Sequence, residues 1–216
     1  MKQQVIKKKW FNINAPKVLG GKTFGETYLA DPEKAINRKV TTSLMNVTGE
    51  PSKQSVSVSF RITSKKGDAL ETSLTKYGIN PSAVRKMMRK KRSKVDDSFV
   101  VKTKDGLIIR IKPVLITKGK TKGSVLAILK HKSREFIATT LKNRNFDDLI
   151  KGLVEKKFQK ELAMALKKIQ PVVISEIRQV IILEGKQAEK VKLIKPSAEP
   201  VKEEKPAEEP APKAEA

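Results

Sequence analysis

Adjacent carboxylates and a lone histidine are the side chains of this sequence whose types could support catalysis. Asp96-Asp97 and Asp147-Asp148 are pairs of the kind that a metal-dependent nuclease uses to hold divalent ions. Turn and helix-capping roles explain both pairs without a metal, and we interpret His131 as an exposed helix residue between lysines. We therefore predict that the protein is not an enzyme and holds no metal, no cofactor and no small-molecule substrate.

A short glycine-rich segment and the absence of cysteine exclude further kinds of site. Gly20-Gly21-Lys22-Thr23 ends like a phosphate-binding loop, but the earlier glycine and the strand that such a loop requires are not there. Without cysteine, the chain has no disulfide framework, no thiolate zinc site and no cysteine nucleophile. The remaining side chains favour binding rather than catalysis.

Clustered cations are the chemical feature that recurs along the chain. From Arg85 to Arg92 the basic side chains cover more than one face of a predicted short helix, which leaves roughly a few tenths of a kcal/mol of repulsion per like-charged pair. A phosphate backbone would remove that repulsion. The alternatives are a merely solvated helix, or a membrane surface into which only Val84, Met87 and Met88 could insert.

Two more basic segments fit an RNA partner. Lys118, Lys120 and Lys122, together with Gly119 and Gly123, form a flexible loop that could mould to an RNA groove, although a generic exposed loop has the same pattern. In Lys7–Phe11, cations precede aromatic rings that could stack on bases or simply anchor the segment to the core. The predicted RNA-contacting residues are Lys7, Lys8, Lys9, Trp10, Arg38, Arg85, Lys86, Arg89, Lys90, Lys91, Arg92, Lys118, Lys120, Lys122, Lys130 and Arg134.

The overall charge indicates the same class of partner. The 216 residues carry a formal net charge of +24 and a pI near 10.1, which attracts polyanions and makes nucleic acid the expected partner. The final 21 residues hold six acidic residues and three lysines, so the other 195 residues carry +27. The sequence shows no signal peptide and no apolar run of membrane length. We expect a soluble, cytoplasmic protein with no membrane partner.

Alternating residues predict the strands that position these side chains. In Gln54–Ile62 apolar and polar residues alternate, and a turn leads into Ala69–Tyr77, so a hairpin is expected. Phe99–Lys104 leads through Asp105-Gly106 into a second returning strand, with a bulge or an edge position at Pro113.

Helical spacing dominates the rest of the chain. An asparagine-proline cap opens a short basic helix over residues 81–92. A long amphipathic helix is predicted over residues 125–141, and residues 149–169 continue the helical spacing, with Gly152 as the point where the stretch divides into two helices. Val172–Leu183 is rich in valine and isoleucine and is predicted to return to the sheet as a strand.

These elements predict an α+β fold with an antiparallel, β-rich, barrel-like core, a short basic helix, a C-terminal helical section and an extended N-terminal arm. Residues 1–25, punctuated by proline and glycine, are predicted to form the basic arm, and residues 26–185 a mixed α+β RNA-binding domain. Residues 186–216 are rich in proline, alanine, glutamate and lysine. They are expected to be disordered, because they bury too little apolar area to offset the entropy of ordering.

Several segments, taken in order, resemble one family, the S-three-a proteins (unified name e-S-one) of the archaeal and eukaryotic small ribosomal subunit. The resemblance covers roughly residues 7–185. It is carried by Lys8-Lys9-Trp10-Phe11 with Ala15-Pro16, Asn37-Arg38-Lys39-Val40 with Ser43-Leu44, Val101–Gly106 with Arg110, and Ile169-Gln170-Pro171. Asn37 and Asn46 stand where the family has glycine and an acidic residue.

This resemblance implies a structural constituent of the small subunit, placed on its platform near the messenger-RNA exit. It implies small-subunit ribosomal RNA and neighbouring small-subunit ribosomal proteins as partners, with messenger RNA close by, and it brings no catalytic residues. Two other hypotheses remain open. One is a free nucleic-acid chaperone or DNA-compacting protein with the same charge. The other is an RNA-processing nuclease that uses Asp96, Asp97, Asp147 and Asp148.

Overall fold

One open sheet of nine strands runs through residues 8–184, the part of the chain that this computed structural model describes. The strands are β1 Lys9–Asn14, β2 Thr23–Leu29, β3 Lys39–Ser43, β4 Val56–Lys66, β5 Ala69–Ile79, β6 Lys94–Asp96, β7 Phe99–Lys102, β8 Ile108–Thr117 and β9 Val172–Ile182. The predicted α+β class with an antiparallel core is confirmed, but the sheet does not close into a barrel. Lys7 and the predicted tail of residues 186–216 lie outside the described residues.

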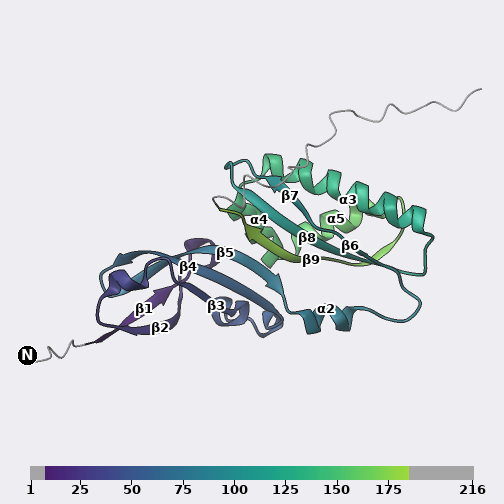
Figure 1. The fold of residues 1–216 in the computed structure, drawn as a ribbon. Helices are drawn as coiled ribbons and strands as arrows, with labels where there is room; N and C mark the ends of the chain where they lie inside the picture. Colours follow the sequence, from purple (N-terminus) through teal and green to yellow (C-terminus); the bar gives the residue numbers. More distant parts are fainter. Residues whose placement is uncertain (1–7, 185–216) are drawn as a thin grey trace, which may run out of the picture.

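Five α-helices accompany the sheet within the described residues. They are α1 Leu44–Thr48, α2 Pro81–Met87, α3 Gly123–Asn143, α4 Phe146–Val154 and α5 Lys157–Leu166. Figure 1 shows α3, α4 and α5 gathered against the C-terminal strands, while α1 lies beside β3 and α2 follows the end of β5. None of the helices in residues 8–184 is long and apolar enough to cross a membrane.

Strands β5 and β9 join the two halves of the sheet (Figure 1). The strand order is β2-β1-β5-β9-β8-β6, with β4 and then β3 added beside β5, and β7 paired with β8. Lys76–Gly78 of β5 pairs antiparallel with Gln179–Ile181 of β9. The N-terminal strands and the last strand of the described chain therefore share one continuous surface.

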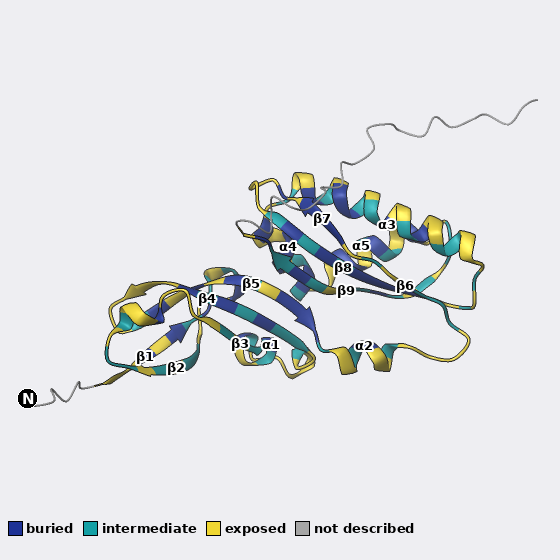
Figure 2. Ribbon diagram, in the orientation of Figure 1, coloured by how far each residue is buried: buried dark blue, intermediate teal, exposed yellow. Residues whose placement is uncertain are grey.

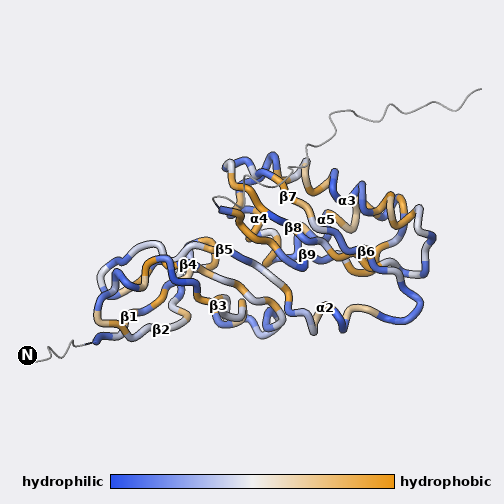
Figure 3. The backbone as a smooth tube through the Cα atoms, in the orientation of Figure 1, coloured by the Kyte–Doolittle hydropathy of each residue, from blue (hydrophilic) through white to orange (hydrophobic). Residues whose placement is uncertain are grey.

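The main core lies between this sheet and the helices. Phe60, Leu115, Leu129, Ile137 and Phe158 are almost completely buried in it. Figure 2 shows buried residues along β8 and β9 and on one side of α3, whose other side is exposed, and Figure 3 shows hydrophobic and hydrophilic stretches along the same strands. The predicted amphipathic helix and the predicted returning strand are thus confirmed as α3 and β9.

The two predicted hairpins are confirmed. Strand β4 pairs with β5, and β7 pairs with β8 across the Asp105-Gly106 turn. A register shift between Lys112 and Pro113 confirms the predicted bulge. On its other edge β8 pairs with β6 through Val114–Ile116 and with β7 through Ile108–Ile111. Pro113 lies opposite the gap between β6 and β7, where its missing N–H leaves no strand without a hydrogen-bond donor.

The segment that the sequence predicts as an extended basic arm contains a strand, β1, that the sequence does not predict. Within it, β1 pairs antiparallel with β2 and parallel with β5. Phe11 and Ile13 are buried in a small second cluster with Ala35, Ile62 and Leu70. Two inward residues are too few to produce a recognisable alternation, and the partner that stabilises the strand lies far along the chain, so local patterning misses it.

Two helix boundaries also differ from the prediction. Helix α2 ends at Met87 rather than near Arg92, because an extension would stack like charges such as Arg85 and Arg89 on one face. The break between α4 and α5 lies at Lys156, which has a left-handed φ of 59°, and not at Gly152. Gly152 lies inside α4, where a Cβ would make an ordinary van der Waals contact with Cβ of Phe158 at 3.7 Å, so this glycine neither ends the helix nor is required by its packing.

Candidate nucleic-acid interface

The predicted RNA-contacting residues lie in several regions of the surface. Lys8–Trp10 are exposed at the start of β1, toward one end of the molecule, and Arg38 is exposed just before β3. Residues 85–92 and 118–122 lie near β6, toward the other end (Figure 1). Lys130 and Arg134 are half-buried on α3. The structure therefore brings together only part of the predicted set.

Two basic loops that are separate in the sequence meet through uncharged residues. The N–H of Thr117 donates to the carbonyl oxygen of Ser93 (3.0 Å), and the N–H of Ser93 donates to Oγ1 of Thr117 (3.1 Å). The N–H of Thr121 donates to Oγ of Ser93 (3.1 Å). Loop 88–93 and loop 118–122 are consequently held side by side.

We call the cations of these two loops the basic junction. Its residues are Arg89, Lys90, Lys91, Arg92, Lys118, Lys120 and Lys122, all of them exposed except the half-buried Arg92. Within residues 8–184, none of them forms an ion pair with an acidic side chain. Arg85 and Lys86, exposed on α2, continue the positive charge toward β5. A surface of this kind favours a polyanion over an uncharged partner.

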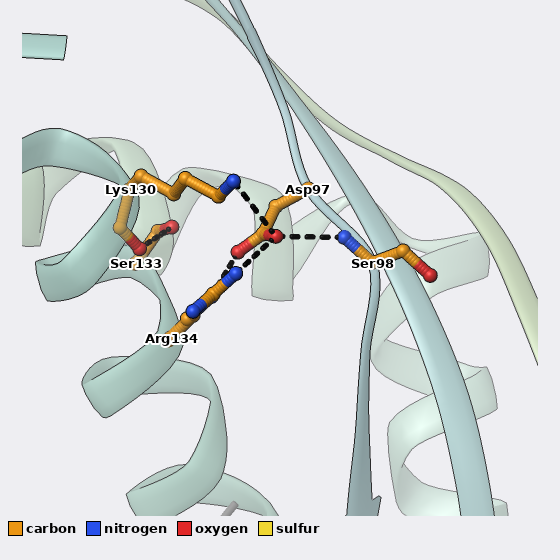
Figure 4. Close-up of polar contacts among 5 residues, drawn as sticks. All are labelled: Asp97, Ser98, Lys130, Ser133 and Arg134. Atoms are coloured by element: carbon orange, nitrogen blue, oxygen red, sulfur yellow. Dashed lines mark hydrogen bonds and ion pairs between the residues drawn. The ribbon is translucent and has the colours of Figure 1, made fainter. Parts of the chain in front are cut away.

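Lys130 and Arg134 differ from the junction, since both have a partner inside the fold. Asp97, whose side chain is 3% exposed, accepts hydrogen bonds from Nε and Nη2 of Arg134 and lies 3.6 Å from Nζ of Lys130. Figure 4 shows both basic side chains reaching from α3 toward this carboxylate. This contact anchors α3 to the gap between β6 and β7. An RNA contact by either residue stays a prediction.

The electrostatics of Asp97 follow from that geometry. Burial alone would raise the pKa of its carboxyl group. The hydrogen bonds from Arg134 and from the backbone of Ser98, together with the charges of Arg134 and Lys130, outweigh burial and hold that pKa below its ordinary value. Asp97 is therefore an ionised structural group, not a proton donor.

The other predicted carboxylates also have structural roles. Asp96 pairs with Lys94 at 2.5 Å, and Asp147 and Asp148 occupy the first turn of α4 as predicted. Asp105 caps the same helix, because its Oδ2 accepts the N–H of Phe146 at 2.7 Å. In residues 8–184 no group of three or more histidine, cysteine, aspartate or glutamate side chains is placed to hold a metal ion.

An exposed aromatic pair lies at the N-terminal end, and the sequence predicted one of its two members, Trp10, as an RNA contact. Trp10 on β1 and Tyr28 on β2 are directly paired across the two strands, with ring centroids 4.9 Å apart. They are 64% and 50% exposed, and Nζ of Lys8 lies 5.8 Å from the centroid of the Tyr28 ring. Sequence patterning missed Tyr28, since only the β1–β2 pairing places it beside Trp10. Exposed rings next to a cation form a surface on which bases can stack.

The chain is similar to known proteins of the small ribosomal subunit. Residues 1–186 match the model of the Ribosomal S3Ae family. The chain is 34% identical over 187 residues to "Small ribosomal subunit protein eS1" of Saccharolobus islandicus, covering 84% of this chain and 90% of the relative. It is 32% identical over 177 residues to the protein of the same name from Methanothermobacter thermautotrophicus, covering 82% of this chain and 91% of the relative.

Proposed function

Since the chain belongs to the Ribosomal S3Ae family, we propose that it binds small-subunit ribosomal RNA on the platform of the subunit, near the messenger-RNA exit. Membership of this family makes the protein a component of the small ribosomal subunit in the cytoplasm. Its role there is that of a structural constituent of the translation machinery and not that of an enzyme.

The basic junction is the observation that carries the RNA-binding proposal. Seven cations from two loops converge without an internal partner in the described residues, and a partly buried network of hydrogen bonds fixes their relative position. Neutralising phosphates with such side chains releases counterions, so affinity falls steeply as salt concentration rises. Arg38, Lys8, Lys9 and Trp10 extend the proposed contact area toward the other end of the sheet.

The platform position is the finer part of the proposal. It rests on the family resemblance of residues 8–11, 37–44, 101–110 and 169–171, and so does the proximity of messenger RNA. Neighbouring small-subunit proteins are the second class of proposed partner. Trp10 and Tyr28 are the exposed aromatic pair of the described residues, and aromatic residues are also common at protein interfaces.

The geometry disfavours one of the two competing hypotheses, and the relatives disfavour the other. A nuclease would need its carboxylates free to hold metal ions, whereas Asp97 is buried against Arg134 and Asp96 pairs with Lys94. A free chaperone or DNA-compacting protein needs only charge. The relatives named above, with their coverage of more than four fifths of this chain, favour a fixed place in the ribosome instead.

Sedimentation in a sucrose gradient tests the proposal. The protein is followed in a cell lysate at moderate salt and again after a high-salt wash, across the free, small-subunit and whole-ribosome fractions. We expect stoichiometric presence in the small subunit under both conditions. A free pool that follows bulk nucleic acid would support the chaperone hypothesis instead.

The platform position needs a second readout. Ultraviolet cross-linking of intact small subunits, followed by mapping of the linked nucleotides, identifies the RNA that the protein touches. We expect cross-links to platform RNA and to messenger RNA at the exit side. Cross-links confined to the head or body of the subunit would contradict the platform position while leaving the ribosomal role intact.

A further inference from the structure

A polar hollow on the sheet is lined by none of the basic-junction residues. It has a volume of about 430 Å³ and is formed where β3, β4, β5 and β9 meet. We call it the sheet trough. The lining residues that matter here are Lys39, Ser59, Arg61, Lys76, Ile181 and Glu184.

Strand register places three cations on one side of the trough-forming strands. Lys39 of β3 is the direct cross-strand partner of Arg61 on β4. Lys76 of β5 lies opposite Ser59 of β4 on one side and Ile181 of β9 on the other. Because paired residues project to the same face of a sheet, the side chains of Lys39, Arg61 and Lys76 converge on the hollow.

The floor of the trough is low enough for a ligand to approach the strands. Ser59 and Thr75 are the two short side chains among those that line it, and the hydroxyl of Ser59 is hydrogen bonded to that of the neighbouring Thr41 at 2.9 Å. Hydroxyl groups also donate readily to phosphate oxygens.

The charge of the trough is incompletely compensated. Glu184 is the one acidic residue among those lining it, and it pairs with Nη1 of Arg61. Nε of Arg61 is buried and has no hydrogen-bond partner within the described residues. Lys39 and Lys76 form no ion pair there either. A buried donor without an acceptor costs free energy that an anion would recover.

We propose that the sheet trough binds a phosphate of an RNA backbone through Lys39, Arg61 and Lys76, with Glu184 as a competing internal anion. The guanidinium of Arg61 offers the fork of donors that matches phosphate oxygens, and the two lysines supply charge on either side of it. The inference rests on the proposed function only in taking RNA as the source of the phosphate. It adds a second contact area, on a surface that the two halves of the chain build together.

A charge-matched pair of variants tests the trough on the purified full-length chain. Lys39→Gln/Lys76→Gln removes the two lysines and leaves Arg61 and its ion pair in place. The control, Lys160→Gln/Lys168→Gln, removes the same charge from exposed lysines in and after α5 that do not line the trough. Binding is measured by fluorescence anisotropy with a fluorescein-labelled 20-nucleotide uridylate RNA over a range of potassium chloride concentrations, and folding by circular dichroism.

We expect the trough variant to lose on the order of tenfold in affinity near physiological salt, and the control about twofold or less. Affinity falls as salt rises, so the slope of log affinity against log salt is negative. It should become less steep by about 1.4 in the trough variant, since each of the two lost contacts to single-stranded RNA contributes about 0.7. Equal losses in the two variants would overturn the proposal.

Glu184→Gln gives a change in the opposite direction. Removing the competing carboxylate should raise RNA affinity severalfold, while Glu33→Gln, at an exposed position outside the trough, should raise it less. An affinity no higher than that of the control would contradict the competing role of Glu184.

Lysine acetylation of the wild-type chain, mapped by mass spectrometry, needs no substitution. The uridylate RNA should protect Lys39 and Lys76 but not Lys160. Protection by poly-glutamate and not by RNA would overturn the proposal in favour of an acidic protein segment. These measurements are independent of sedimentation, so a chain that sediments with the small subunit but shows no protection would contradict the trough alone.

Discussion

Ser93 and Thr117 lie 24 residues apart but exchange two hydrogen bonds, since the N–H of Thr117 donates to the carbonyl oxygen of Ser93 and the N–H of Ser93 donates to Oγ1 of Thr117. Thr117 is completely buried, and its Oγ1 lies 2.6 Å from the carbonyl oxygen of Gly119 and 3.1 Å from that of Ser93. The position of the cations in the basic junction therefore depends on a neutral side chain that is buried beneath them.

Replacing Thr117 by valine should separate the geometry of the junction from its charge. Valine has nearly the same shape but leaves the N–H of Ser93 without its acceptor, so we expect a loss of about 1–2 kcal/mol in the free energy of unfolding. RNA affinity should fall a few-fold with no change in net charge. Chemical denaturation and fluorescence anisotropy measure the two effects. Thr140→Val, which removes a hydrogen bond inside α3, is the control and should leave RNA affinity unchanged.

Removing the lysines of loop 118–122 should lower the salt dependence of RNA binding. For Lys118→Gln/Lys120→Gln/Lys122→Gln we expect the negative slope of log affinity against log salt to become less steep by about 2, because three phosphate contacts to single-stranded RNA are lost. The matched control removes three exposed lysines, Lys142 on α3, Lys160 on α5 and Lys168 just after α5. The same slope in both variants would mean that binding depends on net charge and not on the junction.

Arg134→Met should destabilise the fold by about 2 kcal/mol at neutral pH. It leaves the buried carboxylate of Asp97 with Lys130 as its remaining charge partner, and the partial exposure of Arg134, 29% of its side chain, limits the loss. Lys132→Met, which breaks an exposed pair with Glu135, should cost less than about 0.5 kcal/mol.

The same Arg134 variant predicts a dependence on pH. In the wild type the pKa of Asp97 is lowered in the folded state, so its contribution to stability is present above the ordinary pKa and is lost as pH falls through the folded value. The stability difference between wild type and Arg134→Met should therefore narrow as pH falls below the ordinary aspartate pKa of 3.8. Thermal melts from pH 7 down to acid denaturation measure it, and a difference that stays constant over that whole range would argue against an ionised Asp97.

Glu176→Gln should stabilise the protein at neutral pH. Burial raises the pKa of Glu176, despite opposing effects of the Lys156 charge and a hydrogen bond from Gln159, so ionising its carboxyl group costs stability as pH rises through that raised pKa. We expect a melting temperature about 2–4 °C higher at pH 7, equivalent to roughly 1 kcal/mol, with little difference below the ordinary pKa of glutamate. Glu33→Gln, at an exposed position, should show no such gain.

Trp10 offers an intrinsic probe of base stacking, because it is the one tryptophan of the sequence. If bases stack on the Trp10–Tyr28 pair, adding RNA should quench tryptophan fluorescence, and Trp10→Ala should weaken RNA binding by about 1–3 kcal/mol. Trp10→Phe keeps an aromatic face and should retain most of the affinity. Binding without quenching would assign the pair to a protein partner instead.

Much of the fold was accessible from local patterning. Alternation in Gln54–Ile62, the Asp105-Gly106 turn and the bulge at Pro113 each depend on a few consecutive residues, whose backbone preferences act over that same distance. The end of α2 was predicted wrongly, and the strand β1 was not predicted. Like-charge repulsion decides the first, and pairing with the distant β5 decides the second.

The sequence by itself determined the α+β class, the excess of positive charge and the family, since these follow from composition, short-range periodicity and ordered motifs. The tertiary structure alone decided which cations act together. It joined the two loops through Ser93 and Thr117, placed Lys39 and Lys76 in one trough, and paired Arg134 with Asp97. Strand register and long-range hydrogen bonds set these relationships, and neither is encoded in the spacing of neighbouring residues.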